Sequence, residues 1–138
     1  MNMNKIILTF AVIFFALSSF NCNEGQNIAK ITFHYVDFET ETPFQVSCND
    51  FENLFSGTYK TTDISNKNQL SDFENYLSYC NILDTAKKID VRVKALITYT
   101  NKKTSVLCMD RFNNLVLDNK SISTNKEIVA FIRRQLDK

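Results

Sequence analysis

The sequence predicts an α+β fold, a single small domain in which a mainly antiparallel sheet carries two or three helices on one face. Two patterns indicate this. Residues 89–118 alternate apolar and polar side chains between short polar turns, which is typical of a three-stranded antiparallel meander. Residues 125–137 repeat apolar side chains at helical spacing instead. Strands with helices set between and after them argue for the α+β class.

The first strand of the predicted meander has the clearest alternation. One face carries Val91, Val93, Ala95, Ile97 and Tyr99, and the other carries Arg92, Lys94 and Thr98. Residues 100–104 then turn the chain into a second strand at 105–112. A further turn at Asn113 and Asn114 leads into a third strand at 115–118.

The final helix has a start signal, because the Thr-Asn-Lys-Glu run at 124–127 has the form of a capping box. A second, longer helix is expected after Ser65 or Asn66, either of which can cap it. Its apolar stripe is Leu70, Phe73, Leu77 and Cys80.

The remaining elements are shorter. Residues 28–38 predict a strand whose inward face consists of Ala29, Ile31, Phe33 and Tyr35. Residues 44–46 and 58–64 suit brief strands, and the polar run at 47–50 suits the start of a short helix.

The N-terminus has the form of a secretory signal over residues 1–18, with one lysine, an apolar run and small residues near the cut. The domain is then 19–138, exported to the periplasm or the extracellular space. An alternative cut just before Cys22 would leave a lipid-anchored envelope protein. Asn21 disfavours it, because lipoprotein signals usually place a small residue there.

Four cysteines bear on this choice: Cys22, Cys48, Cys80 and Cys108. Disulfide formation is expected in an exported protein, and four cysteines allow three pairings. We expect Cys48 to pair with Cys80, since both fall near predicted helix ends, whereas Cys108 suits a buried small hydrophobe in a strand. A lipid on Cys22 would leave one cysteine without an intramolecular partner.

Composition excludes several function classes. The net charge is +1, so nothing draws the chain to nucleic acid, and a membrane is expected only through a lipid on Cys22. Because the sequence has only two glycines, it contains neither a phosphate-binding glycine loop nor a nucleophile elbow. We therefore expect no catalytic, cofactor-binding or metal-binding residues, and no cofactor.

Polar residues at two places in the sequence could carry chemistry. His34 is the single histidine, and an enzyme would have to use it or a free cysteine. Asp37, Glu39 and Glu41 would share a face if extended, although a solvated acidic edge is the expected outcome.

The sequence predicts a small exported binding or inhibitor-like module that acts on another protein. The proposed partner patch is Val36, Phe38 and Phe44, which fall off the main apolar stripe. The alternatives are an accessory lipoprotein and, less favoured, a small hydrolase. Asn119-Lys120-Ser121 also fits the N-glycosylation pattern, which matters only in a eukaryote.

Overall fold

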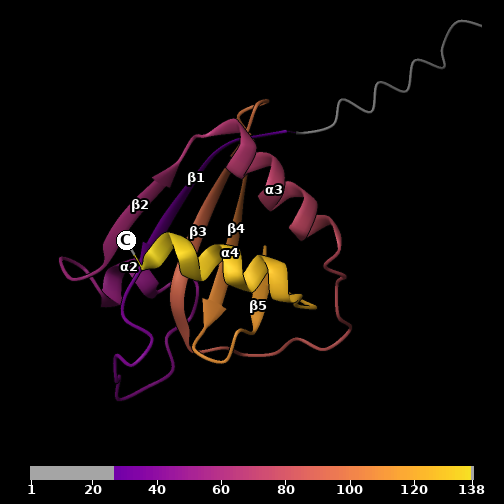
Figure 1. Ribbon diagram of the computed structural model, residues 1–138. Helices are drawn as coiled ribbons and strands as arrows, with labels where there is room; N and C mark the ends of the chain where they lie inside the picture. Colours follow the sequence, from indigo (N-terminus) through magenta and orange to yellow (C-terminus); the bar gives the residue numbers. More distant parts are fainter. Residues whose placement is uncertain (1–26, 138) are drawn as a thin grey trace, which may run out of the picture.

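The computed structural model describes residues 27–137, which form a six-stranded antiparallel sheet with three helices (Figure 1). The predicted α+β class is confirmed. The signal peptide predicted over residues 1–18, and Cys22, lie outside the described residues. In sheet order the strands are β2 (Lys60–Ile64), β1 (Ile28–Tyr35), β3 (Val91–Tyr99), β4 (Thr104–Asp110), β5 (Leu115–Leu117) and β6 (Lys120–Ile122).

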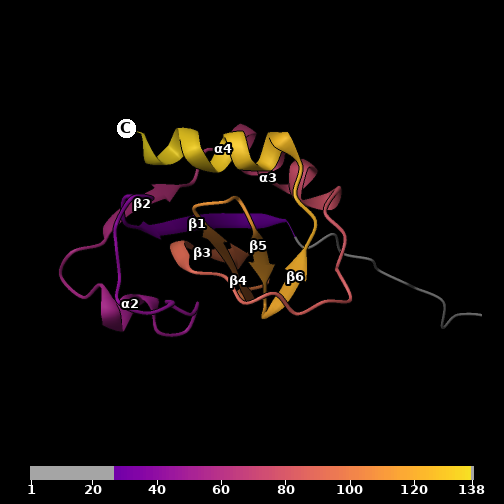
Figure 2. The ribbon, with the colours of Figure 1, turned by 90° about the horizontal axis from the view of Figure 1, so that it is seen from below.

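The three helices cover opposite faces of this sheet. Figure 2 shows α3 (Lys67–Ser78) and α4 (Lys126–Leu136) side by side on one face, as predicted for the long helices. The third helix, α2 (Phe51–Leu54), lies on the other face with the loops that flank it. The sheet is therefore buried on both sides over much of its area.

The predicted meander is present as β3, β4 and β5, which pair in succession with Ala95 opposite Leu107 and Cys108 opposite Val116. Strand β6 was not predicted. It follows a turn at Asp118 and Asn119, both of which have positive φ angles, of 47° and 65°. A tight hairpin of this kind requires left-handed backbone at both central positions.

The larger core lies under α3 and α4. Phe33, Ile97 and Leu107 of the sheet are at most 1 % exposed, and the ring of Phe73 in α3 packs against that of Phe131 in α4, tilted by 54° with centroids 5.4 Å apart. The predicted stripes of both helices contribute to this cluster, because helical spacing brings their apolar side chains to one side.

Two β-bulges change which residues face that core. An irregularity between Ile28 and Lys30 buries Ile28 and leaves Ala29 exposed, so the prediction for Ala29 was wrong. Another, between Val91 and Val93, sends Val91 to the core on the opposite face. An extra residue in one strand reverses the alternation locally.

The helix caps differ in one place from the sequence pattern. Asn66 caps α3 as expected, with its Oδ1 accepting from the backbone N–H groups of Asn68 and Gln69 at 3.0 and 3.2 Å. Helix α4 begins one residue later than its predicted capping box. Asn125, not Thr124, is its cap, and Asn125 Oδ1 accepts from the N–H of Ile128 at 2.8 Å.

Candidate binding surface

The face opposite α3 and α4 is covered by the chain between β1 and β2, residues 36–59, which we call the covering segment (Figure 2). Its buried residues Val36, Val46, Phe51 and Phe55 pack against Ile89, Val91 and Cys108 of the sheet side. The only regular structure in the segment is the four-residue α2. Helices this short are not stable alone, so contacts with the sheet must hold the segment in place.

The strand predicted at 44–46 is absent, because the backbone of Val46 hydrogen-bonds to Asp90 and Val91 instead of forming a strand ladder. Its N–H donates to Asp90 Oδ1 at 2.8 Å, and its carbonyl accepts from the N–H of Val91 at 3.0 Å. These two bonds anchor the middle of the covering segment to the start of β3. Val46 is wholly buried as a result.

Arg92 is the strongest polar anchor, although its side chain was predicted on the polar face of the strand. The side chain is 0 % exposed, and its two terminal nitrogens bind the two oxygens of Asp90 at 2.9 and 2.8 Å. Its Nε donates to the carbonyl of Thr40 at 3.0 Å. A buried guanidinium requires such pairing, because an unpaired charge in the interior is costly.

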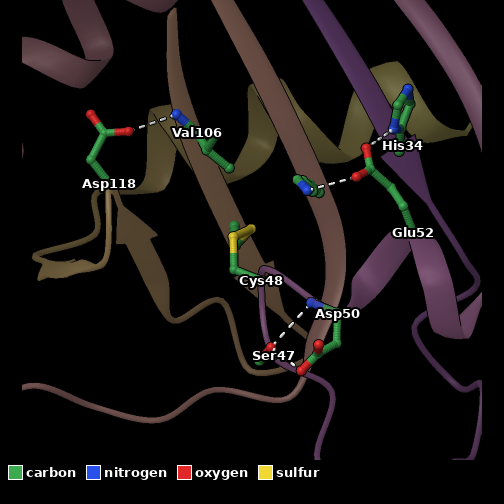
Figure 3. Close-up of a disulfide and its surroundings, with 9 residues drawn as sticks. His34, Ser47, Cys48, Asp50, Glu52, Val106 and Asp118 are labelled. Carbon is green, nitrogen blue, oxygen red and sulfur yellow. Dashed lines mark hydrogen bonds and ion pairs between the residues drawn. A yellow bond between two sulfur atoms is a disulfide. The ribbon is translucent and has the colours of Figure 1, made fainter.

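A disulfide joins Cys48 of the covering segment to Cys108 of β4, with the two Cα atoms 6.0 Å apart (Figure 3). The predicted pairing of Cys48 with Cys80 was wrong. Cys80 packs beside the core under α3, on the other side of the sheet from Cys48, and within residues 27–137 it has no disulfide partner. Nearness of both residues to helix ends along the chain could not show that the sheet separates them.

His34 belongs to a polar cluster that binds α2 to the sheet (Figure 3). Glu52 of α2 lies between two side chains of the sheet. Its Oε1 is 2.9 Å from His34 Nδ1 on β1, and its Oε2 accepts from Lys94 Nζ on β3 at 2.8 Å. Tyr59 stacks on the imidazole, with ring centroids 4.8 Å apart.

The electrostatics of this cluster favour the ionised carboxylate. The hydrogen bond from Lys94 holds the pKa of Glu52 below its ordinary value, in opposition to burial, and the bond with His34 acts in the same direction. Lys94 is only 10 % exposed, so it needs this negative partner. The cluster therefore attaches α2 to the sheet.

The acidic residues Asp37, Glu39 and Glu41 do not share an extended face. Strand β1 ends at Tyr35, and the chain turns at residues 38 and 39. Asp37 is exposed and lies 3.5 Å from Lys60 Nζ. Within residues 27–137, no group of three or more acidic, cysteine or histidine side chains is placed to hold a metal ion.

The three residues of the predicted partner patch lie in different environments. Val36 is buried at 7 % exposure in the core under the covering segment. Phe38 is half-buried against the larger core, with the guanidinium of Arg133 4.1 Å above its ring. Phe44 is 56 % exposed. The patch is thus reduced to Phe44.

The backbone around Phe44 is fixed although its ring is exposed. Thr42 Oγ1 donates to the Phe44 carbonyl at 2.8 Å, and Arg92 binds Thr40 upstream. Val46 and Cys48 anchor the chain downstream. Phe44 therefore projects from a loop attached to the sheet on both sides.

A hollow of about 460 Å³ borders the same loop. One wall is formed by Gln45, Ser47 and Cys48, and the other by residues 86–89, with Val116 and Asn119 completing it. Phe44 immediately precedes Gln45 in the chain but is not itself one of the lining residues. The lining contributed by the described residues includes Lys87 and Lys88 and no carboxylate.

Two further observations bear on the molecule's surroundings. Within residues 27–137, no helix is long and apolar enough to cross a membrane. Asn119 of the glycosylation pattern is exposed in the β5–β6 turn.

Comparison of the chain with models of known protein families, with curated proteins and with solved structures gives no match in any of the three.

Several residues that build this surface were missed by sequence reasoning. Glu52 lies 42 residues from Lys94, and only the fold brings the two together. Asp90 lies two residues from Arg92, so that pair is local in the sequence. One signal was available: Arg92 and Lys94 lie inside a strand with apolar residues on both sides of each. Basic residues in such a run predict buried partners if the second face of the sheet is covered.

Proposed function

We propose that this protein is an exported, non-catalytic module that binds another protein through the loop around Phe44. The observation that carries the proposal is an exposed aromatic ring on a backbone anchored at both ends. Rigid aromatic side chains lose little conformational freedom on binding, and anchoring the loop beforehand lowers the entropic cost further.

The hollow beside Phe44 supports a more specific description of the partner. Two lysines line the hollow: Lys87, whose Nζ donates to Asn114 Oδ1 at 2.8 Å, and Lys88, which is exposed. Because the lining has two lysines and no carboxylate, it favours negatively charged groups. We expect the partner to present an apolar pocket for the Phe44 ring, bordered by acidic side chains.

Export is supported by the Cys48–Cys108 disulfide, since such bonds persist mainly in oxidising compartments. A non-catalytic role is supported by the use of the polar cluster. The carboxylate of Glu52 is occupied by His34 and Lys94, and those contacts hold α2 in place. The same arrangement gives His34 a structural task and leaves the hydrolase alternative without a supporting contact.

The test is affinity capture from the native culture fluid or envelope with wild-type protein and two matched variants. Phe44→Ala removes the proposed anchor. Phe112→Ala removes a ring that is 76 % exposed in the β4–β5 turn, so it controls for a general loss of surface hydrophobicity. A specific partner is retained by wild type and Phe112→Ala and lost by Phe44→Ala.

Once a partner is identified, its affinities for wild type and for Phe44→Ala show how much the Phe44 ring contributes to binding. Loss of a central aromatic anchor weakens binding about 30-fold or more. Lys88→Glu is expected to slow association and to reduce its dependence on salt. A partner whose affinity is the same for Phe44→Ala and wild type would overturn the assignment of this surface.

A further inference from the structure

The two edges of the sheet differ in their protection against pairing with another chain. Strand β2 forms one edge, and its charged residues Lys60 and Asp63 are both exposed. Charged side chains on an edge strand oppose the addition of a further strand. At the other edge, the chain that follows α3 runs beside β6 (Figure 2), and its residues 79–83 include no charged side chain. This stretch therefore lacks the protection that β2 has.

Residues 81–83 continue the sheet beyond β6 through two backbone hydrogen bonds. The N–H of Leu83 donates to the carbonyl of Ser121 at 2.8 Å. In the opposite direction, the N–H of Ser123 donates to the carbonyl of Asn81 at 2.8 Å. The two bonds run antiparallel and leave one residue of each chain segment between them.

The residue between these bonds is Ile82, which lies directly opposite Ile122 in an antiparallel bridge. Because the bonds flank the bridge, the two residues form the non-hydrogen-bonded type of antiparallel pair. In that type, the N–H and C=O groups of each residue point away from the other. Those of Ile82 therefore point outward from the sheet, and within residues 27–137 they have no hydrogen-bond partner.

Exposed apolar side chains are concentrated at the same edge. Six large apolar side chains are exposed in residues 27–137, and three of them are Tyr79 at 69 %, Ile82 at 65 % and Leu83 at 44 %. Ile82 shares a face of the sheet with Ile122, which is buried in the core under α3 and α4. An uncharged, apolar edge with outward backbone groups is suited to the addition of another strand.

We propose that this edge binds the same edge of a second copy of the chain, with Ile82 opposite the second copy's Ile82. The N–H and C=O of one residue point the same way here, so two copies related by a two-fold axis can exchange both hydrogen bonds. The two isoleucine side chains then meet on one face of the joined sheet. No like charges oppose each other across the axis, because residues 79–83 are uncharged. This inference goes beyond the binding function proposed for Phe44.

Sedimentation equilibrium of the mature protein, at concentrations up to about 1 mM, tests the proposal. We expect a reversible equilibrium between monomer and dimer, because a single bridge makes a short contact and short contacts are weak. Ile82→Pro removes the outward N–H without removing an internal hydrogen bond. It should weaken association about 10-fold or more and leave thermal unfolding of the monomer unchanged. Phe112→Ala, at another exposed ring, should associate like wild type.

Three results would overturn the proposal. The first is a chain that stays monomeric over this whole range of concentration. The second is a dimer that Ile82→Pro leaves unchanged. The third is a dimer that persists in sodium dodecyl sulfate without reductant, because that dimer would be held by a disulfide and not by strand pairing.

A pair of charged variants tests the register of the two copies. Ile82→Glu and Ile82→Lys each place like charges directly opposite one another in a homodimer, which is destabilising. Each variant alone should be monomeric, and an equimolar mixture should form a heterodimer in which opposite charges meet. A mixture that stays monomeric would show that Ile82 does not face its own copy, and it would overturn the pairing.

Failure here is distinguishable from failure of the proposed function. Ile82 lies on the face of the sheet that α3 and α4 cover, whereas Phe44 belongs to the covering segment on the other face. Ile82→Pro should therefore leave capture through Phe44 unchanged, and Phe44→Ala should leave the dimer intact. A monomeric chain that still loses its partner on Phe44→Ala would overturn the dimer alone.

Discussion

The two faces of the sheet are covered in different ways. Under α3 and α4, apolar side chains from two helices and from most strands of the sheet form one large cluster. Under the covering segment the apolar cluster is smaller, and a disulfide, a buried arginine and the Glu52 cluster add to it. The helices α3 and α4 are therefore held mainly by buried apolar area, and the covering segment is held largely by the disulfide and a few ion pairs.

The difference follows from the elements that each face has available. Helices α3 and α4 each present several apolar residues in one stripe, which is enough to bury a wide surface. Helix α2 has four residues and buries only Phe51. A loop with so little regular structure needs directional contacts to adopt one conformation, and such contacts also fix the exposed Phe44 in position.

The largest effect is expected on the helix-covered face. Phe73→Ala removes a ring that is 0 % exposed and packed against Phe131, so the free energy of unfolding should fall by about 3–5 kcal/mol. Urea denaturation followed by circular dichroism measures this. Phe112→Ala, at an exposed site, should change stability by no more than about 0.5 kcal/mol. Equal losses from the two variants would contradict the core assignment.

A smaller effect is expected when the arginine anchor of the other face is broken. Asp90→Ala leaves Arg92 buried without its carboxylate. We expect a loss of about 2–3 kcal/mol, because Asp90 is one third exposed and water replaces part of the pair. Hydrogen exchange should quicken at Val46, whose N–H donates to Asp90, while α3 and α4 keep their relative protection.

The control for that experiment removes both charges. Asp90→Ala combined with Arg92→Met should be less destabilised than Asp90→Ala alone, since no unpaired charge then remains in the interior. If the double variant has the lower free energy of unfolding of the two, Arg92 stabilises the segment through its bonds to Thr40 and Val91 rather than through Asp90.

The smallest effect is a pH dependence of the Glu52 cluster. The pKa of Glu52 is lowered in the folded state from its ordinary value of 4.5, so its contribution is complete above that value. It is lost as pH falls below 4.5 through the lowered pKa. Glu52 is 34 % exposed, and water screens the pair, so Glu52→Gln should cost about 1 kcal/mol or less at pH 7.

Stability curves at pH 7 and pH 3 for wild type and Glu52→Gln separate this group from the other carboxylates. The difference between the two proteins should shrink as the pH falls below 4.5 through the lowered pKa, because a proton on Glu52 removes the negative partner of Lys94 that the variant already lacks. A difference that is constant with pH would show that the contribution of Glu52 is independent of its charge.

Much of the helix-covered face could be predicted from the sequence. The stripes of α3 and α4, the meander and the Asn66 cap follow from spacings of a few residues, which local geometry controls. The bulges at Ala29 and Val91 could not be predicted in this way, because they depend on the register between strands far apart in the chain.

The binding surface was predictable only in part. Phe44 was identified because it falls off the apolar stripe, but Val36 and Phe38 share that property and are covered by tertiary contacts. The Lys94–Glu52 pair could not be found locally, because 42 residues separate its members. Asp90 lies two residues from Arg92, but that Arg92 is wholly buried depends on the covering segment.

The sequence by itself determined the class of fold, the elements that cover one face of the sheet and the presence of cysteines able to bond. The tertiary structure alone decided that Cys48 meets Cys108, that the sheet keeps Cys80 from both, and that Phe44 projects from an anchored loop. The physical reason is that periodicity is a local property of the chain. Pairing between distant side chains depends instead on which face of the sheet each one reaches.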